Sequence, residues 1–328
     1  MSRLPRRRLR TFLGYALAAA CLYWVVRHLD PGELLRRLGK MDLSWVAAAI
    51  LFDVLSYVCQ GLRWKLLLRV VDKVTVLQTT KAIYAGLFVN EMLPMKLGEI
   101  VRTFLISRWT DVKLSTVIPS ILLERLYDGV WLAIGIVITI LLVPLPHRLV
   151  EAGDVFAISI LAALFIVALL AVAGREGPAN ESRKSFASRA RSIAHELRLA
   201  GLTRAGLAAF VLSLLFLLLQ GFSFWFVMRA YGLPLNVLVG LAVFIIVHLG
   251  TLIPTAPANI GSYQFFTVFG LTLFGVEKTT AAGFSLVVFT VLTLPLWAIG
   301  SWALGSSGLT LLQIRSELTT WFRSNRST

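Results

Sequence analysis

The chain has little charge and almost no cysteine. Only 15% of its 328 residues are charged and 57% are hydrophobic, whereas soluble domains carry about 25% charged residues. Its two cysteines, Cys21 and Cys59, lie in apolar runs, which argues against a disulfide or a metal site and predicts free, buried thiols. With a mean hydropathy of +0.79, this composition excludes an ordinary soluble domain and indicates a membrane protein.

Signatures of nucleotide-driven and hydrolytic enzymes are also absent. The sequence has no Walker-type phosphate loop, no His/Cys metal spacing, no Gly-x-Ser-x-Gly and no dinucleotide-binding fingerprint. We therefore expect no cofactor, no metal and no ATP-driven step within this chain, and a transporter-like protein rather than an enzyme.

Acidic residues are scarcer than basic ones, 17 against 32, which gives a net charge of +15. Nucleic-acid binding is not indicated, because the charges are spread over loops between apolar runs. With a cytoplasmic N-terminus, 24 Lys and Arg residues lie on the cytoplasmic side and seven on the outer side. We therefore expect a multi-pass protein of the bacterial inner membrane, with both termini cytoplasmic and with membrane lipids as its partners.

The apolar runs predict an all-α polytopic membrane protein with about six full spans and two broken or re-entrant helical hairpins. A basic N-terminus, residues 1–10, precedes a single transmembrane domain, 11–304, and a cytoplasmic tail, 305–328. The first run resembles a signal peptide, but it continues to Val26, which favours an uncleaved helix. The expected spans are 11–26, 43–62, 116–143, 155–173, 205–228 and 280–304, with hairpins at 82–108 and 237–274, an interfacial stretch at 31–40 and a cytoplasmic loop at 174–204.

The two halves of the domain share one pattern. Repeat one, about 11–143, contains Pro94-x-x-x-Gly98, and repeat two, about 155–304, contains Pro257-x-x-x-Gly261; residues 144–154 join them. Each half has two spans, a broken segment and a further span, and the basic residues orient the halves oppositely. This order predicts an inverted-topology repeat, in which a substrate site lies where two broken helices meet.

The first break carries charge. Pro94 ends the incoming helix and Gly98 permits a tight turn, within the segment Pro94-Met95-Lys96-Leu97-Gly98-Glu99-Ile100-Val101-Arg102. Glu99 and Arg102 share a helical face and can pair. Lys96 and Arg102 together suit an anionic phosphate. The alternative is a cytoplasmic loop whose charges face water.

A second charged motif, Glu124-Arg125-Leu126-Tyr127-Asp128, lies inside the long run 116–143. Glu124 and Asp128 are one helical turn apart and share a face. Arg125 points about 100° away and can meet Glu99 or another acid. These residues form either part of a substrate path or a salt-bridge cluster that only fixes packing.

The second break is polar and uncharged. It begins at Pro254 and contains Pro257 and Gly261. We expect Asn259, Ser262 and Gln264 to line a polar cavity opposite the first break; the alternative is an ordinary extracytoplasmic loop. Asp53 stands alone in the run 43–62, where an acid is costly unless paired or neutral. It is therefore a candidate proton site, or a partner of Arg125.

These motifs resemble the transmembrane "flippase-like" family, which is related to the membrane domain of bacterial lysylphosphatidylglycerol synthases. The matching segments are Leu93–Arg102, Glu124–Asp128 and Pro254–Gly261. Where the family often has Gly after the second Pro and Glu near the end of the third segment, this chain has Ala258 and Gln264. About 24 residues follow the last span, so the resemblance implies the translocation half of such a synthase without its aminoacyl-transferase domain.

The sequence therefore favours a lipid translocase that moves an anionic phospholipid or another amphiphile between leaflets. Two alternatives remain at this stage. One is a membrane-embedded lipid-headgroup transferase with Glu124 or Asp128 as general base. The other is a non-catalytic subunit that assembles with lipid- or glycan-synthesis enzymes.

Overall fold

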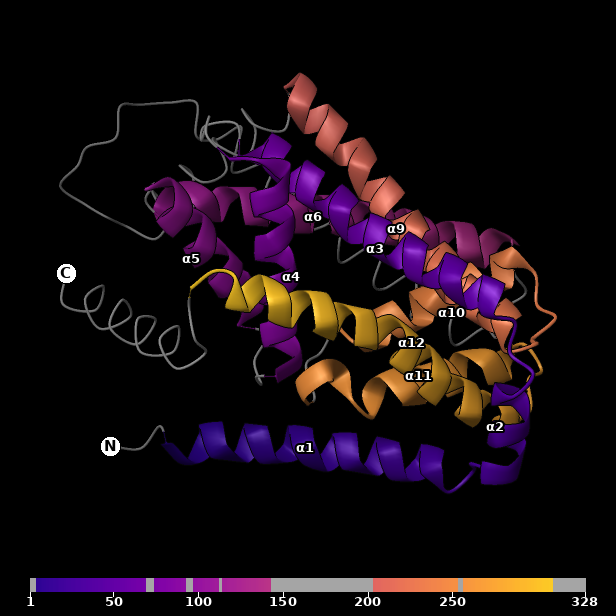
Figure 1. Cartoon of the computed structure of the whole chain (residues 1–328). Coiled ribbons are helices and arrows are strands. Elements are labelled where there is room, and N and C mark those ends of the chain that lie inside the picture. The colour runs from indigo at the N-terminus through magenta and orange to yellow at the C-terminus, as the bar shows by residue number, and fades with distance from the viewer. Residues whose placement is uncertain are drawn as a thin grey trace.

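A computed structural model describes residues 4–68, 74–92, 97–111, 114–142, 203–252 and 256–308; side chains are described from Gly14 onward in the first helix and, with one exception, from Val117 onward in α6. The described residues are helical and contain no strand (Figure 1). The elements are α1 (Leu4–Val26), α2 (Pro31–Leu38), α3 (Leu43–Leu67), α4 (Val76–Met92), α5 (Gly98–Thr110), α6 (Leu114–Leu142), α9 (Arg204–Ala230), α10 (Val237–Gly250), the 3-10 turn η1 (Pro257–Asn259), α11 (Ser262–Leu273) and α12 (Lys278–Gly305).

Local sequence explains where several helices begin. Asp42, Thr203 and Asn236 precede α3, α9 and α10, and each side-chain oxygen accepts a hydrogen bond from a backbone N–H of the first turn, at 2.9, 3.0 and 2.9 Å. Such N-caps satisfy donors that a helix start leaves without a partner.

Four helices in the described ranges are long and apolar enough to cross a membrane: 43–67, 119–142, 204–230 and 278–305. They confirm four of the six predicted spans. The first predicted span is helical as α1, although its apolar part, Gly14–Val26, is shorter than these four. The predicted span 155–173, the loop 174–204 apart from its last two residues, and the tail from 309 lie outside the described residues.

The two halves repeat one order of helix lengths. α3, α4, α5 and α6 have 25, 17, 13 and 29 residues, and α9, α10, α11 and α12 have 27, 14, 12 and 28. Packing repeats as well, because α3 packs on α4 as α9 packs on α10, and α12 packs on α4 as α6 packs on α10. This reciprocity is typical of two units related by a twofold axis.

The equivalent helices α3 and α9 lie side by side and run in opposite directions (Figure 1). The amide of Asp42, before α3, donates to the carbonyl of Ala230 at the end of α9, at 3.3 Å. Further along, the Ser223 hydroxyl donates to the Ala49 carbonyl at 2.8 Å. Equivalent helices that span in opposite directions define an inverted repeat, as predicted.

The first break forms an antiparallel hairpin of α4 and α5. The two helices meet at glycines: a Cβ atom added to Gly98 would lie 1.9 Å from the backbone oxygen of Gly86. The Gly98 amide donates to the side-chain oxygen of Asn90 at 2.6 Å. At about 1.5 Å per residue neither helix reaches across a hydrocarbon core of about 30 Å. The predicted short hairpin is therefore present, although Pro94 lies outside the described residues.

The second break, between α10 and α11, is closed by its own side chains. Gly261 has φ of 91° and its amide donates to the Gln264 side-chain oxygen at 2.7 Å. Gln264 is buried and caps α11, because an amide three residues after a break satisfies the free donor there. Its place in a polar cavity stays a prediction. Pro257 opens η1, and Pro254 lies outside the described residues.

α1 and α2 lie at the edge of the repeats. α1 packs along α11 (Figure 1), and the glycine at position 261 allows a backbone approach, because a Cβ there would lie 2.2 Å from the Ala18 oxygen. α2 matches the predicted amphipathic stretch, and its Glu33 accepts a 2.8 Å hydrogen bond from Thr280 of α12. Both cysteines are free thiols, Cys59 buried and Cys21 partly so.

Candidate functional site

α6 presents two acids on one face, one turn apart. Glu124 is fully buried and the Asp128 side chain is 20% exposed. Glu124 stands five residues after Pro119, where the apolar part of α6 begins, which is about 7 Å along the helix. The acids therefore lie near one end of a spanning helix, and both contact the same arginine, as their predicted common face requires.

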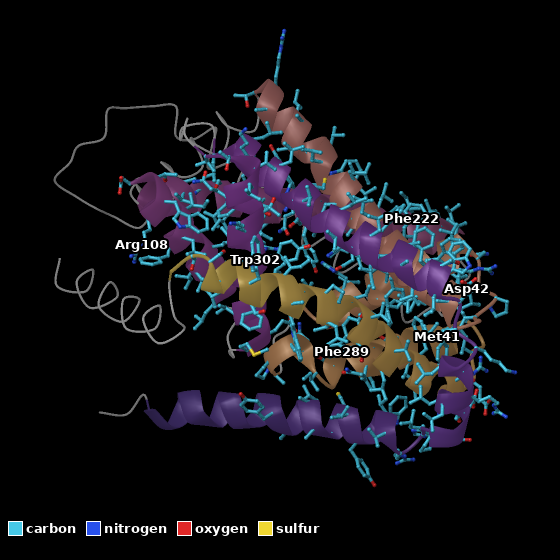
Figure 2. All side chains as sticks on the ribbon, in the orientation of Figure 1. Met41, Asp42, Arg108, Phe222, Phe289 and Trp302 are labelled. Carbon is cyan, nitrogen blue, oxygen red and sulfur yellow. The ribbon has the colours of Figure 1, made fainter. Side chains whose placement is uncertain are left out.

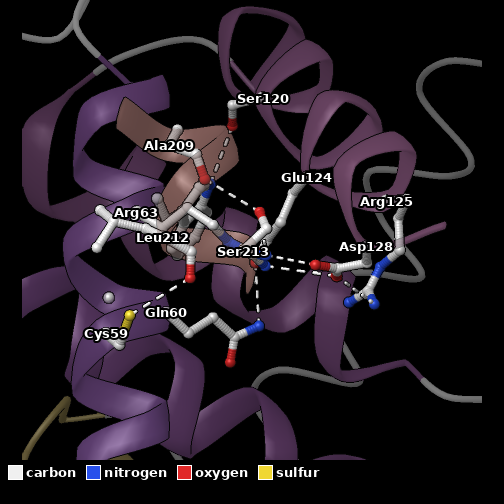
Figure 3. A network of polar contacts seen from close by, with 12 residues as sticks. Cys59, Gln60, Arg63, Ser120, Glu124, Arg125, Asp128, Ala209, Leu212 and Ser213 are labelled. Carbon is white, nitrogen blue, oxygen red and sulfur yellow. Dashed lines mark hydrogen bonds and ion pairs between the residues drawn. The ribbon is translucent and has the colours of Figure 1, made fainter. Parts of the chain in front are cut away.

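That arginine is Arg63 of α3, which lies one residue beyond the predicted span 43–62. α3 continues to Leu67, so Arg63 lies within the helix and is fully buried. Its guanidinium forms ion pairs with Glu124 and Asp128 and donates to the Ser213 hydroxyl of α9 at 2.9 Å (Figure 3). It also stacks over the Phe216 ring, with 5.2 Å to the centroid.

Arg102 of α5 approaches Glu124 from another side. It is 3% exposed and its guanidinium lies 2.7 Å from the Glu124 carboxylate. The guanidinium also lies 4.7 Å from the centre of the Trp64 ring, a cation–π distance. The expected pairing of Arg102 with Glu99 is therefore replaced by a pair with Glu124, because the α5 face that carries Arg102 turns toward α6.

The half-exposed end of the group is formed by Arg125, Glu99 and Asp128. Arg125 lies 2.8 Å from Glu99 and 3.5 Å from Asp128. The Arg125 and Glu99 side chains are 49% and 41% exposed. The predicted meeting of Arg125 with Glu99 is confirmed. The predicted alternative, a pair between Arg125 and Asp53, is not formed in the described structure.

Together these six side chains form a continuous series of opposite charges, which we call the ion-pair ladder. Its members in order are Glu99, Arg125, Asp128, Arg63, Glu124 and Arg102. It begins at a half-exposed pair and ends at a fully buried one, and it joins α3, α5 and α6. Three acids balance three arginines, so the ladder is neutral as a whole.

The buried end of the ladder keeps unused hydrogen-bonding capacity. The Gln60 amide donates to Glu124 at 3.0 Å. The Nε atoms of Arg63 and Arg102 and the Oε1 atom of Gln60 are buried, without a partner in the described structure. A buried donor without a partner is costly, so these atoms are places where an additional polar group would be stabilised.

Burying ion pairs is an inefficient way to stabilise a folded protein. Removing two charges from water can cost more free energy than their mutual attraction contributes. Apolar side chains of similar volume at the same positions often give equal or greater stability. Buried charges in membrane spans are for the same reason associated with function. This argument favours a substrate path over the packing-only interpretation that the sequence left open.

The remaining candidate residues divide into three groups. Lys96 lies outside the described residues, so its proposed role with Arg102 stays a prediction. Asn259 is held in a left-handed conformation with φ of 51°, and its Oδ1 atom is buried without a partner in the described structure. Asp53 is buried on α3, apart from the ladder.

No group of three or more His, Cys, Asp or Glu residues in the described ranges is placed to hold a metal ion.

Arg63 was missed because the predicted span ended at Leu62. A signal was present: Gln60 and Arg63 are three residues apart, on one face of a helix that has no breaker until after Leu67. Extending the helix by one turn would have moved Arg63 from a basic loop to the membrane edge, beside the acids of the next long span.

Comparisons with known proteins agree with this architecture. The sequence model described as "Lysylphosphatidylglycerol synthase TM region" matches residues 11–300. Two proteins of Methanothermobacter thermautotrophicus, each named UPF0104 membrane protein, are 21% and 22% identical, over 85% and 83% of this chain and 88% and 86% of their own lengths. These archaeal relatives support a multi-pass membrane protein, and they do not support the bacterial membrane predicted above.

A third relative is named Glycosyltransferase AglD, from Haloferax volcanii. It is 28% identical over 125 residues, which are 37% of this chain. The matched part is only 20% of the relative's own length, so most of that protein has no counterpart in the match.

Proposed function

Since the chain belongs to the family of the lysylphosphatidylglycerol synthase transmembrane region, we propose that it is a lipid translocase. Its substrate is an anionic phospholipid or another amphiphilic lipid, which it moves between the two leaflets. The observation that carries this proposal is the ion-pair ladder, because its charges alternate from a half-exposed pair to a fully buried pair between two spanning helices, α3 and α6, and the short helix α5.

An anionic headgroup can enter the ladder by exchanging partners. A phosphate offers a guanidinium the same paired oxygen acceptors as a carboxylate does. As the headgroup replaces Glu99 on Arg125, and later Glu124 on Arg102, each arginine keeps an acidic partner. The unpartnered Nε donors of Arg63 and Arg102 supply further hydrogen bonds at the buried end.

The broken hairpins supply a polar route beyond the ladder. Non-helical backbone is tolerated at membrane depth only where it is buried in protein or lines a cavity. Each break lies between two short helices of its own repeat, and secondary transporters place their substrates where two such broken helices meet. The lipid tails would remain in the bilayer while the headgroup follows this route.

The test is leaflet exchange of a fluorescent phosphatidylglycerol in liposomes that contain the full-length protein. Arg102→Gln is expected to slow exchange by about 10- to 100-fold, because a hydrogen bond to a charged group contributes about 1.5–3 kcal/mol and about 1.4 kcal/mol is tenfold in rate. The matched control is Arg36→Gln on α2, which is exposed and outside the ladder; it should exchange lipid as the wild type does.

Two outcomes would contradict the proposal. One is a folded wild-type protein that accelerates exchange of no lipid across a range of anionic and neutral headgroups. The other is an Arg102→Gln variant with a wild-type melting temperature and a wild-type exchange rate, since the ladder would then carry no substrate.

The relative named as a glycosyltransferase makes a headgroup transferase the second candidate. Glu124 is poorly placed as a general base, because its carboxylate already accepts hydrogen bonds from Arg63, Arg102 and Gln60. Lipid mass spectrometry of a deletion strain separates the two functions. A missing modified lipid favours the transferase, whereas an unchanged lipid set with altered leaflet distribution favours the translocase.

A further inference from the structure

A second group of polar side chains surrounds Asp53 and does not belong to the ladder. Asp53 is 4% exposed and lies ten residues into α3, about 15 Å along that helix. An ionised carboxylate near the middle of a spanning helix is strongly disfavoured unless a cation accompanies it, whereas the neutral acid is tolerated.

No basic side chain in the described ranges forms an ion pair with Asp53. Arg125 is engaged by Glu99 and Asp128. Among the helices packed on α3, α4 carries Lys81, which lies over the Trp302 ring, and α12 carries Lys278, which lies over the Trp24 ring. The arginines of α9, Arg204 and Arg229, stand at its two ends, and the single arginine of α6, Arg125, belongs to the ladder.

The titratable groups that interact electrostatically with Asp53 are tyrosines. Tyr57 of α3, Tyr84 of α4 and Tyr263 of α11 each lie within electrostatic range of its carboxyl. The Tyr57 and Tyr84 rings are 5.3 Å apart, and the Tyr84 hydroxyl is buried without a hydrogen-bond partner in the described structure. Glu91 of α4 is a second acid in range of Tyr57 and Tyr263.

This group, the Asp53 cluster (Asp53, Tyr57, Tyr84, Glu91 and Tyr263), connects the two breaks. Glu91 is the last residue but one of α4, before the first break, and Tyr263 is the second residue of α11, after the second break. Tyr263 also packs against Phe289 of α12, which Figure 2 labels beside α11, with 5.5 Å between ring centres. The cluster therefore lies where the two inverted repeats meet, the usual place of coupling-ion sites in such folds.

We propose that Asp53 binds and releases a proton during the transport cycle, and so couples lipid translocation to a transmembrane proton gradient. This inference rests on the translocase function proposed above. A proton passes from water on one side to the Asp53 carboxylate, which becomes the neutral acid, and later to water on the other side. Only O–H bonds form and break, and the Tyr84 hydroxyl, which is buried without a hydrogen-bond partner in the described structure, is a spare donor in the same cluster. A metal ion fits less well, because three of the five side chains in the cluster are phenols.

The test uses the full-length protein in liposomes and compares leaflet exchange of labelled phosphatidylglycerol with and without an imposed pH gradient at zero membrane potential. In the wild type the gradient is expected to change the exchange rate at least threefold, with opposite signs for opposite gradients. Asp53→Asn should exchange lipid at a rate that does not respond to the gradient.

The matched control is Asp42→Asn, at the start of the same helix (Figure 2). Asp42 is an exposed N-cap, and hydrogen bonds from Ser44 hold the pKa of its carboxyl below the usual range. Asn caps a helix about as well as Asp, so this variant should respond to the gradient as the wild type does.

The outcomes separate the two proposals. Absence of exchange in the wild type under every condition overturns the translocase function. Three results overturn only the proton coupling. The exchange rate of the wild type does not respond to the pH gradient, it responds to a sodium gradient at constant pH, or Asp53→Asn responds to the pH gradient as the wild type does.

A second measurement does not depend on transport or on the folding of one variant. Infrared difference spectra of the wild type between acidic and alkaline pH should contain a carbonyl band of a buried neutral carboxylic acid. That band should be lost in Asp53→Asn and shifted in Tyr84→Phe. If Asp53→Asn does not fold, Tyr84→Phe remains as the test, and an unshifted band together with a wild-type gradient response would overturn the proposal.

Discussion

Glu124→Gln is expected to lower the free energy of unfolding by about 3–5 kcal/mol, the usual cost of removing one partner from a buried ion pair. Glu124 is the acid that Arg63 and Arg102 share. Replacing it with a neutral amide leaves Arg63 with Asp128 and deprives Arg102 of the acid that it contacts at the buried end of the ladder. The measurement is the melting midpoint in detergent, together with the yield of monodisperse protein.

Glu99→Gln is the matched control for this change. It makes the same acid-to-amide replacement at the other end of the ladder, in a pair whose side chains are 41% and 49% exposed. Exposed ion pairs contribute about 0–1 kcal/mol, so this variant should melt close to the wild type. Equal melting midpoints for Glu124→Gln and Glu99→Gln would show that burial of the ladder does not determine its energetics.

Gly98→Ala is expected to produce the second large effect, a loss of at least about 1–3 kcal/mol, the usual range for overpacking. The added methyl group would lie 1.9 Å from the backbone oxygen of Gly86 and 2.7 Å from the Asn90 side-chain oxygen. The first of these atoms belongs to the backbone of α4, so relief requires the two helices to separate. Lipid exchange should fall with stability, since Arg102 is carried on the displaced helix.

Gly305→Ala is the control for this substitution. Gly305 ends α12, and no atom lies within 4 Å of the position that its Cβ would take. The same chemical change there should leave the melting midpoint within experimental error. A Gly98→Ala variant as stable as Gly305→Ala would exclude the close helix crossing at the first break.

The ladder was only partly predictable. The sequence predicted that Glu124 and Asp128 share one face of α6, because that depends only on the helical period. It also predicted that Arg125 can pair with Glu99, because their charges are opposite and both lie near helix ends. The sequence did not predict which acid pairs with Arg102, because Glu99 and Glu124 are both negatively charged and both suit an arginine. The choice depends on how α5 is rotated against α6, and no local pattern encodes that rotation.

The sequence by itself determined four of the spans, the positions of the two breaks and the opposite orientation of the halves. Hydropathy, Pro-x-x-x-Gly and the distribution of basic residues are local or additive signals, so each can be read without knowing what packs against what. Only the tertiary structure decided that Arg63 is buried, that Gln264 caps α11, and that Tyr84 and Tyr263, from opposite repeats, come within electrostatic range of Asp53. Those facts depend on contacts between residues far apart in the chain, and such contacts are fixed by the packing of the two inverted repeats.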